Sequence, residues 1–415
     1  MGEDTAGGRH VGRRVLLIVA VALAALLVAA IPSILKLGDF AARVEEGMLA
    51  EPEVQAFYDV PSPAPSGEPG EVVRIEPAAG APDGSRAWRV QYHSTDETGA
   101  DAIVSGMIIA PAAGTAAEKP RTLVLWGHPT TGIAPRCAPS IGVAPFALIE
   151  GLQDLLDAGF VVAAPDYAGM GMPGPPSFLL GDTEAANLLD IARAAQAIPE
   201  VVVSDEVLLW GHSQGGHAAL FAAQNAADYA PELTVLGVAV AAPATDLGDL
   251  LKADIGDVSG VTIGAYAFSS YAAAYADTLP PDPLDLILTD AGAAAVPRMS
   301  ELCLLGQNDE LHKIATPLIG GFVSHPPEST NPWDDLLAAN TPQQTALPMP
   351  LFVAQGEADE LVRPDITAEY VRTQQTAGTD VTSHTYPGVG HGGVALKAMD
   401  ALIPWLTGLR DEAGR

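Results

Sequence analysis

The feature that most constrains the fold of this chain is a short stretch around one serine. Residues 207–217 read VLLWGHSQGGH, so an apolar, strand-forming run ends at Gly211 and two glycines after Ser213 lead into an alanine-rich run. A strand, a tight turn and a helix in this order form a nucleophile elbow, in which the residues beside the serine must be small. A bare G-x-S-x-G also arises by chance in a chain with 42 glycines, but the flanking strand and helix favour function. We therefore predict that Ser213 is a nucleophile.

Composition indicates a folded protein that avoids anionic partners. Of the 415 residues, 48% are hydrophobic and 17% are charged, which is typical of a globular chain. The 51 acidic residues outnumber the 20 basic ones and give a formal net charge of -31. A surface of this charge repels nucleic acid and anionic lipid headgroups, so a neutral or apolar substrate is favoured over a phosphorylated one.

The first forty residues have a composition of their own. Arg9, Arg13 and Arg14 precede an uncharged run over residues 15–33, which is typical of an export signal or a membrane anchor. We expect residues 1–40 to direct export, so that the protein is secreted or anchored at the cell surface; whether the segment is cleaved stays open. Residues 41–70 are expected to hold a short helical stretch and a proline-rich linker.

The remaining sequence predicts an α/β fold. Short strands rich in Val and Ile are expected to pair antiparallel at 72–75, 88–93 and 103–110. Further on, apolar runs alternate with helical patterns, which is typical of a mostly parallel sheet covered by helices on both faces. The expected strands are 122–126, 160–164, 207–210 and 236–241, and the expected helices are 146–157, 183–197 and 213–227.

This alternation stops near Thr245 and resumes at Pro350. About a hundred residues lie between, and loops that long without structure are uncommon in compact domains. We therefore predict an inserted, mainly helical cap over residues 245–345, and a core formed by residues 71–244 and 346–415. Aromatic side chains of this cap could line a substrate cavity or fill the cap's own core, namely Tyr266, Phe268, Tyr271 and Tyr275.

A serine nucleophile needs a base, and the base needs a carboxylate that orients it. In this type of fold the order along the chain is serine, acid, histidine. His391 lies in a glycine-rich loop after the expected strand 381–386, and it is the predicted base. Three carboxylates follow the preceding strand, Glu357, Asp359 and Glu360. We choose Asp359, because the acid usually lies in a loop shortly after a strand, and expect the other two to be solvated.

The tetrahedral intermediate also needs hydrogen-bond donors for its oxyanion. The main-chain N–H of Gln214, directly after the nucleophile, is the first predicted donor. The second is expected in the loop after strand 122–126. Because Pro129 in that loop has no N–H, Thr130 or Thr131 must supply this donor.

The other histidines have simpler interpretations. We expect His128 and His217 to orient loops or to cap a helix. The remaining histidines are not grouped as metal ligands would be, so the sequence predicts neither a metal nor a cofactor.

Five motifs carry a family resemblance: GIAPRCAPS at 132–140, PDYAGMG at 165–171, GHSQGG at 211–216, YAPEL at 229–233 and NPW at 331–333. With them the chain resembles the secretory lipase family of fungi and actinobacteria, the lipase A type, over residues 70–410. The resemblance implies an α/β-hydrolase fold with a helical cap inserted before the acid, and hydrolysis of carboxylic esters including triacylglycerols. It also implies Ser213, Asp359 and His391 as the triad. Pro129 departs from the glycine that many bacterial members have there.

The chain has two cysteines, Cys137 in the loop after the expected strand 122–126 and Cys303 in the expected cap. An exported protein meets an oxidising compartment, so we predict a disulfide that ties the cap to the core. The alternative is a pair of buried free thiols.

Together these features predict an exported serine esterase or lipase that cleaves neutral acyl esters such as acylglycerols. Its partner is a small-molecule or lipid ester, and the N-terminal segment could anchor it to a membrane. Charged substrate groups are expected to find no partner in the cavity. The alternatives are a peptidase of the same fold and an inactive binding protein on this scaffold.

Overall fold

The structure is a computed structural model, and it describes residues 52–60, 64–112, 119–142 and 144–415. The predicted export signal or anchor, residues 1–40, lies outside these residues. Among the helices in the described ranges, none has both the length and the hydropathy that crossing a bilayer requires.

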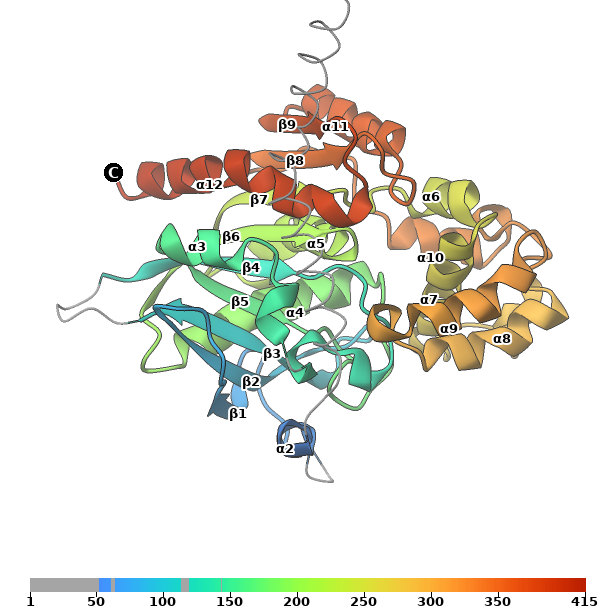
Figure 1. Cartoon of the computed structure of the whole chain (residues 1–415), viewed down its shortest axis with the longest axis horizontal. Helices are drawn as coiled ribbons and strands as arrows, with labels where there is room; N and C mark the ends of the chain where they lie inside the picture. Colours follow the sequence, from blue (N-terminus) through green and yellow to red (C-terminus); the bar gives the residue numbers. More distant parts are fainter. Residues whose placement is uncertain (1–51, 61–63, 113–118, 143) are drawn as a thin grey trace, which may run out of the picture.

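The centre of the protein is a nine-stranded sheet with the order β1-β2-β3-β5-β4-β6-β7-β8-β9 (Figure 1). β1, β2 and β3 pair antiparallel, and β3 pairs antiparallel with β5. From β5 to β9 all pairs are parallel. The strands are β1 Val72–Pro77, β2 Ser85–Thr95, β3 Asp101–Pro111, β4 Arg121–Gly127, β5 Val161–Pro165, β6 Val203–His212, β7 Thr234–Ala241, β8 Leu351–Gly356 and β9 Val381–Tyr386.

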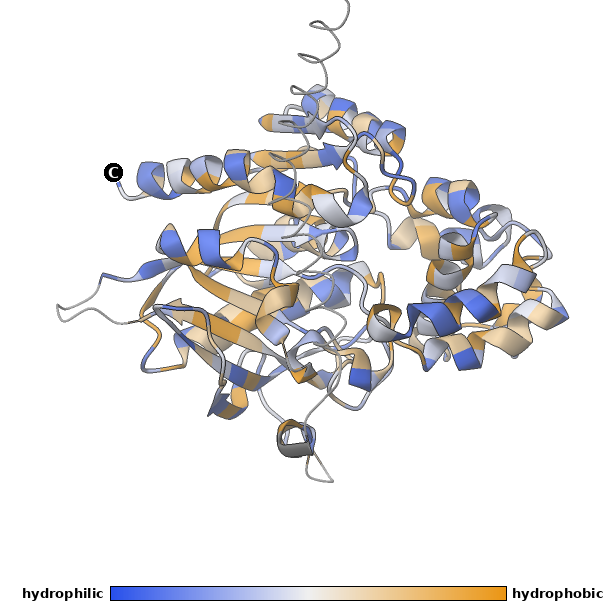
Figure 2. Cartoon of the chain, viewed as in Figure 1, coloured by the Kyte–Doolittle hydropathy of each residue, from blue (hydrophilic) through white to orange (hydrophobic). Residues whose placement is uncertain are grey.

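Both faces of the sheet are covered by helices, because the central strands are apolar on both sides. On β4, Leu123 and Leu125 pack in one cluster with α4 (Gly181–Gln196) and α5 (Gln214–Tyr229). Val124 and Trp126 pack on the opposite side with α3 (Leu152–Asp157) and α12 (Val394–Ala413). In Figure 2 the strands of this sheet are largely hydrophobic, as burial on both faces requires. The predicted mostly parallel sheet with two helical layers is confirmed.

The segment between β7 and β8 is mainly helical and lies to one side of the sheet (Figure 1). Its buried apolar residues belong to the same hydrophobic cluster as those of α3 and α12, so the segment and the core share one hydrophobic interior. The α-helices from here to the C-terminal helix are α6 Leu247–Asp254, α7 Val258–Ala274, α8 Asp290–Ser300, α9 Leu304–Ala315, α10 Trp333–Ala339 and α11 Pro364–Ala377.

The cap aromatics mostly fill the interior. Phe268 packs on Phe322 and Trp333, with ring centroids 6.2 and 5.3 Å away. Tyr266 is fully buried, and its hydroxyl donates to the carbonyl of Leu302 at 2.7 Å. Of the four aromatics, Tyr271 alone also lines the pocket described below.

Two local predictions differ from the structure. The helix expected at 146–157 is a 3-10 turn, Pro145–Leu148, followed by the short α3, because Gly151 between them has a left-handed φ of 79°. The segment before β1 is more than a linker: after α2 (Pro52–Gln55), Phe57 and Tyr58 are buried against the core. The Tyr58 hydroxyl lies 2.6 Å from Ser140 Oγ, so a polar contact holds this segment in place.

Candidate active site

Ser213 stands between the end of β6 and the start of α5, as the elbow motif predicts. Its φ is 57° and its ψ is -117°, a conformation that residues other than glycine rarely adopt. The main-chain N–H of Ser213 donates to the carbonyl of Ala241 on β7 at 2.9 Å. The strained turn is thus held by the neighbouring strand, and the serine is 7% exposed.

The glycines around the serine are required by close backbone contacts. A Cβ on Gly211 would lie 2.0 Å from the carbonyl oxygen of Gly215. A Cβ on Gly215 would lie 1.9 Å from the carbonyl oxygen of Gly127, at the end of β4. Because no rotamer relieves a backbone clash, β4, β6 and α5 can meet this closely only when these positions lack a side chain.

The structure brings the three predicted catalytic side chains into one hydrogen-bonded chain. His391 Nε2 lies 2.9 Å from Ser213 Oγ, and His391 Nδ1 lies 2.8 Å from Asp359 Oδ2. They come from the β6–α5 turn, the loop after β9 and the loop after β8. All three loops follow parallel strands, whose carboxyl ends lie at one edge of the sheet. This geometry lets His391 accept a proton from Ser213 while Asp359 orients the ring.

Asp359 is the carboxylate that contacts His391, while Glu357 and Glu360 are exposed. Its Oδ1 accepts the main-chain N–H groups of Leu361 at 3.0 Å and Val362 at 2.9 Å. Although burial works against ionisation, these bonds and the contact with His391 lower the pKa of Asp359 below its ordinary value. Asp359 is therefore a fixed anion across the neutral range.

Burial lowers the pKa of His391 below its ordinary value. The hydrogen bond with Asp359 opposes this effect, and the charge of the nearby His212 adds to it. The ring is consequently neutral near pH 7, which is the form that a general base needs.

Thr130 and Thr131, the two candidates for the second oxyanion donor in the loop after β4, differ in their surroundings. Thr130 lines the same pocket as Ser213 and Gln214. Thr131 is 1% exposed, its hydroxyl donates to the carbonyl of Cys137 at 2.8 Å and its own carbonyl accepts from Leu304. Thr131 therefore joins this loop to the helical segment, and Thr130 faces the site.

The side chain of Gln214 and its neighbours brace the start of α5. Gln214 Nε2 donates to Glu184 Oε1 at 2.6 Å, and Glu184 also accepts the main-chain N–H of Leu179 at 3.1 Å. Glu184 Oε2 lies 3.4 Å from Nδ1 of His217, whose Nε2 lies 2.7 Å from the carbonyl of Asn340. His217 thus joins helix α5 to the helical segment.

His128 does not contact the three catalytic side chains through a hydrogen bond; it positions the loop after β4. Its Nδ1 lies 2.7 Å from the carbonyl of Pro129, and its ring packs at a tilt against the ring of Tyr167, with a centroid distance of 4.4 Å. These contacts hold the loop that carries Thr130. Within the described ranges no three His, Cys, Asp or Glu side chains are grouped as metal ligands.

A pocket opens over Ser213 between the sheet and the helical segment. Its cavity volume, counted as the space that the centre of a water molecule can reach, is about 70 Å³. Helices α6 and α7 and the loop after β8 supply most of its walls, and the lining is chiefly apolar: Leu247, Leu250, Ile263, Ala267, Leu337 and Val362. Such a pocket suits a neutral hydrocarbon group better than a charged one.

Asp254, at the end of α6, is the exception to the apolar lining. Its Oδ1 lies 3.2 Å from Arg363 Nε, and only 7% of its side chain is exposed. Burial raises the pKa of Asp254 to about 6, although Arg363 opposes the shift. Asp254 is thus an ionisable side chain in the wall that is already paired with Arg363, and the expectation that a charged substrate group finds no partner in the cavity stays a prediction.

Replacing Asp254 by asparagine should change the pH dependence of stability. With a pKa of about 6 in the folded protein and 3.8 as its ordinary value, Asp254 costs stability as the pH rises through this interval. The effect of Arg363 is already contained in this shift, so we expect Asp254→Asn to raise the free energy of unfolding at pH 8 by about 1 to 2 kcal/mol, which is the full shift reduced for solvent screening, and to give no gain at pH 3.5. Urea unfolding at both pH values measures this; a variant less stable than the parent at pH 8 contradicts it.

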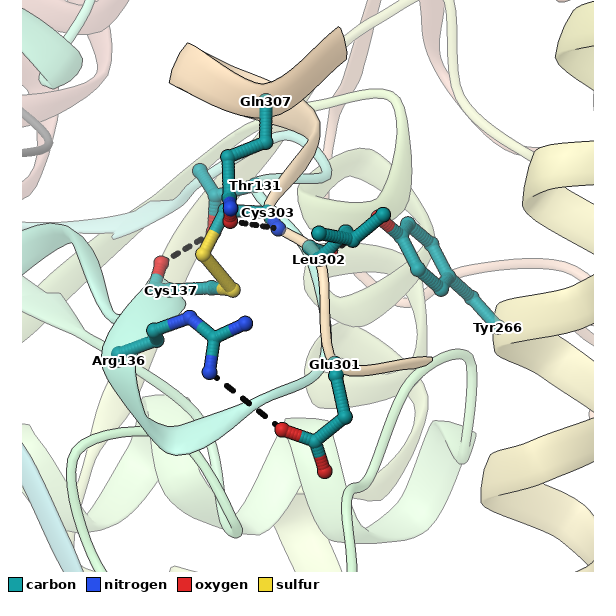
Figure 3. The surroundings of a disulfide bond; sticks show 8 residues. All are labelled: Thr131, Arg136, Cys137, Tyr266, Glu301, Leu302, Cys303 and Gln307. Atoms are coloured by element: carbon teal, nitrogen blue, oxygen red, sulfur yellow. Dashed lines mark hydrogen bonds and ion pairs between the residues drawn. A yellow bond between two sulfur atoms is a disulfide. The ribbon is translucent and has the colours of Figure 1, made fainter. Parts of the chain in front are cut away.

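The structure contains the predicted disulfide between Cys137 and Cys303, which are 166 residues apart in sequence. Figure 3 shows Thr131, Arg136 and Cys137, in the loop after β4, facing Glu301, Cys303 and Gln307. The loop and the helical segment also share an exposed ion pair, Arg136 with Glu301 at 3.4 Å. The disulfide therefore links the segment that follows Thr130 and Thr131 to the start of α9.

Two buried polar side chains beside the site, His212 and Glu150, were not predicted. His212 Nδ1 lies 2.7 Å from Glu150 Oε2, with 2% and 5% of the two side chains exposed. In the sequence Glu150 is a polar residue in an otherwise apolar stretch, and His212 directly follows the apolar run 207–211. Nothing in either stretch indicates that the other is its partner.

Comparison with known proteins identifies a family. The family profile described as Secretory lipase matches residues 148–411. Lipase 10 of Candida albicans is 28% identical over 232 residues, 51% of this chain and 48% of that protein. A protein of Mycobacterium tuberculosis named "probable inactive lipase" is 24% identical over 379 residues, 86% of this chain and 82% of that protein. The chain matches about half the length of the Candida albicans relatives.

Solved structures share the fold. Candida antarctica lipase A in its closed state aligns with a TM-score of 0.72 at 19% identity, over 88% of both chains. A rice cell wall degrading esterase from Xanthomonas oryzae aligns with a TM-score of 0.68 at 20% identity, over 83% of this chain and 98% of that one. These alignments confirm the predicted α/β-hydrolase fold.

Proposed function

The chain belongs to the secretory lipase family, and from this premise we propose that it is a serine ester hydrolase that acts through an acyl-enzyme. The observation that carries the proposal is the hydrogen-bonded chain from Ser213 through His391 to Asp359, at 2.9 and 2.8 Å, in which Ser213 lines an apolar pocket. A peptidase of the same fold would need groups for a peptide terminus or a proline ring, and the pocket walls are chiefly hydrocarbon.

The first half of the reaction acylates the serine. His391 Nε2 takes the proton of Ser213 as Oγ attacks the ester carbonyl carbon, and the carbonyl π electrons move to oxygen. The main-chain N–H groups of Gln214 and Thr130 donate to this oxyanion. When the tetrahedral intermediate collapses, the C–O bond to the alcohol breaks and His391 returns the proton to the leaving oxygen. Asp359 stabilises the imidazolium that exists between these steps.

The second half repeats the same proton transfers with water. His391 removes a proton from a water molecule, the hydroxide attacks the acyl carbon, and collapse of the second intermediate returns the proton to Ser213 Oγ. A carboxylic acid leaves the pocket, and at neutral pH it ionises. The proposed reaction needs no metal or cofactor.

The lining of the pocket supports uncharged acyl esters, such as acylglycerols, as substrates. The apolar walls favour a hydrocarbon acyl chain, whereas an ionic group would lose its hydration there. Relatives are named as a secreted triacylglycerol lipase in Malassezia globosa and a trichothecene C-3 esterase in Fusarium sporotrichioides. These names support an ester as the bond that is cleaved and leave the alcohol side open.

Activity should rise with acyl length until the pocket is filled. Each methylene that the pocket fully buries contributes up to about 0.8 kcal/mol, or about fourfold in kcat/KM. We expect kcat/KM for p-nitrophenyl esters to increase from two carbons to medium chains and then level off. Initial rates from two to sixteen carbons, below the concentration at which the long esters form micelles, measure this. An optimum at acetate, or faster cleavage of amides than of esters, would exclude the acyl pocket.

The same assay decides whether this chain is an inactive member of its family. The inactive alternative is raised by the Mycobacterium tuberculosis relative, and it is opposed by the intact hydrogen-bonded triad. Absence of ester turnover in correctly folded, disulfide-bonded protein would reject the enzymatic proposal.

We also propose that the protein acts outside the cytoplasm. The description of the family as secretory and the disulfide between Cys137 and Cys303 support export. The N-terminal segment, residues 1–40, is the proposed signal or anchor, and cell fractionation of the full chain against one lacking these residues tests it.

A further inference from the structure

A second histidine–carboxylate pair lies beside the proposed triad. His212, the last residue of β6, directly precedes Ser213, and Glu150 lies in the turn before α3. His212 Nδ1 and Glu150 Oε2 are 2.7 Å apart, and both side chains are buried. The main-chain carbonyl of Glu150 also accepts from the indole of Trp210 at 3.4 Å, which ties this turn to β6.

The ring of His212 lies against the ring of the proposed base. The centroids of His212 and His391 are 4.9 Å apart, with an angle of 40° between the ring planes. His212 Nε2 is buried and makes no hydrogen bond of standard geometry within the described residues. A weaker interaction with the main chain of His391 favours the protonated ring of His212. The second pair therefore contacts His391 through its ring and its main chain.

Four ionisable side chains thus share one buried region: Glu150, His212, His391 and Asp359. Two adjacent imidazoles resist taking up two protons, so the region titrates in two coupled steps. Burial opposes a charge on His212, but the carboxylates of Glu150 and Asp359, together with the main chain of His391, outweigh burial and raise the pKa of His212. Burial lowers the pKa of His391, and the charge of His212 lowers it further against the effects of Asp359 and Glu150. The first proton therefore goes to His212.

We propose that the buried His212–Glu150 pair controls the protonation of the base. The pair holds an imidazolium whose ring centroid lies 4.9 Å from that of His391, and this positive charge keeps His391 neutral in mildly acidic solution. This inference rests on the proposed function, in which His391 acts as the base. Its consequence is ester hydrolysis that persists to lower pH than an isolated histidine allows. His212 is a positioning residue here, because it acts through His391 and does not touch the reacting atoms.

Charge alone can be removed while the shape of the region is largely kept. In His212→Phe/Glu150→Gln both charges are lost together, so no buried carboxylate is left unpaired. His212 is nearer to His391 than Glu150 is, and its effect on the pKa of His391 is the larger of the two. We expect the acid limb of the pH profile of kcat/KM to move up by about 0.5 to 1 pH unit. In His212→Phe alone the anion of Glu150 remains, so the shift should be larger.

A matched control is the pair formed by His93 and Asp101, whose Nδ1 to Oδ1 distance is also 2.7 Å. It joins β2 to β3 and does not contact the triad. His93→Phe/Asp101→Asn should therefore leave the acid limb in place. If the pair of His212 and Glu150 were only a structural ion pair, both double variants would behave alike, with a lower melting temperature and an unmoved acid limb.

The experiment measures kcat/KM of p-nitrophenyl butyrate from pH 4.5 to 8 for the parent and the three variants, with circular dichroism to confirm folding. An upward move of the acid limb confined to the His212 variants supports the proposal; no move, or a downward move, overturns it. Histidine NMR titration of the parent decides the case in which a variant does not fold. If the parent has no esterase activity, the proposed function is rejected, and the same NMR titration still tests this inference. In that titration, protonation of His391 before His212 overturns the inference.

Discussion

Replacing Ser213 with alanine is expected to lower ester hydrolysis by about three to six orders of magnitude while the protein stays folded. The alanine removes the oxygen that forms the acyl-enzyme and leaves the oxyanion donors and the pocket, so a small residual rate remains. Backbone strain at a φ of 57° is present with either residue, and the substitution removes the hydrogen bond between Ser213 Oγ and His391 without disturbing the apolar core. Turnover near that of the parent in purified Ser213→Ala would end the proposal of a serine nucleophile.

The other two members of the triad should behave as parts of one unit. His391→Ala is expected to fall by a similar factor, and Asp359→Asn by somewhat less, because Asp359 orients the base and stabilises its charge. Combining these changes with Ser213→Ala should add little further loss. Glu357→Gln is the control, since that carboxylate is exposed in the same loop. If Glu357→Gln lost most of its ester hydrolysis while Asp359→Asn lost little, Glu357 would be the catalytic acid instead of Asp359.

Removal of the disulfide is expected to have the largest effect on stability. For cysteines 166 residues apart, the chain-entropy account gives about 5 kcal/mol, and losses of about 2 to 5 kcal/mol are usual. We expect Cys137→Ala/Cys303→Ala to lower the melting temperature by about 5 to 15 °C. The loss should be accompanied by weaker catalysis, because Thr131 beside the disulfide holds the loop that carries Thr130.

Arg136→Ala is the matched control for this experiment. It breaks the ion pair with Glu301 across the same interface, in which 52% and 72% of the two side chains are exposed. An exposed pair of this kind contributes about 0.2 to 1 kcal/mol, so the melting temperature should hardly change. Thiol titration of the denatured, unreduced protein checks the disulfide directly, and two reactive thiols in exported protein would refute it.

The fold and the candidate triad are largely predictable because they depend on local patterns. A strand is apolar throughout when both faces of the sheet are buried, and this pattern in the sequence indicates the positions of β4 to β8. The elbow is a local motif too, since close approach of Gly211 and Gly215 to other main chains excludes side chains there. The order of Ser213, Asp359 and His391 then follows from the order of the strands that carry them.

What the sequence could not determine depends on contacts between distant segments. Thr130 and Thr131 are adjacent and chemically equal in sequence, and only the packing of the helical segment against Thr131 separates them. Asp254 is one of 51 acidic residues, and only the position of α6 puts it in the wall of an apolar pocket. Glu150 and His212 are 62 residues apart and become a pair only when the turn before α3 packs on the end of β6.

By itself the sequence determined the strands, the elbow and the order of the candidate triad, because each is encoded by neighbouring residues. The tertiary structure decided the pocket and the charges around the base, because burial and distance exist only after the segments have packed together.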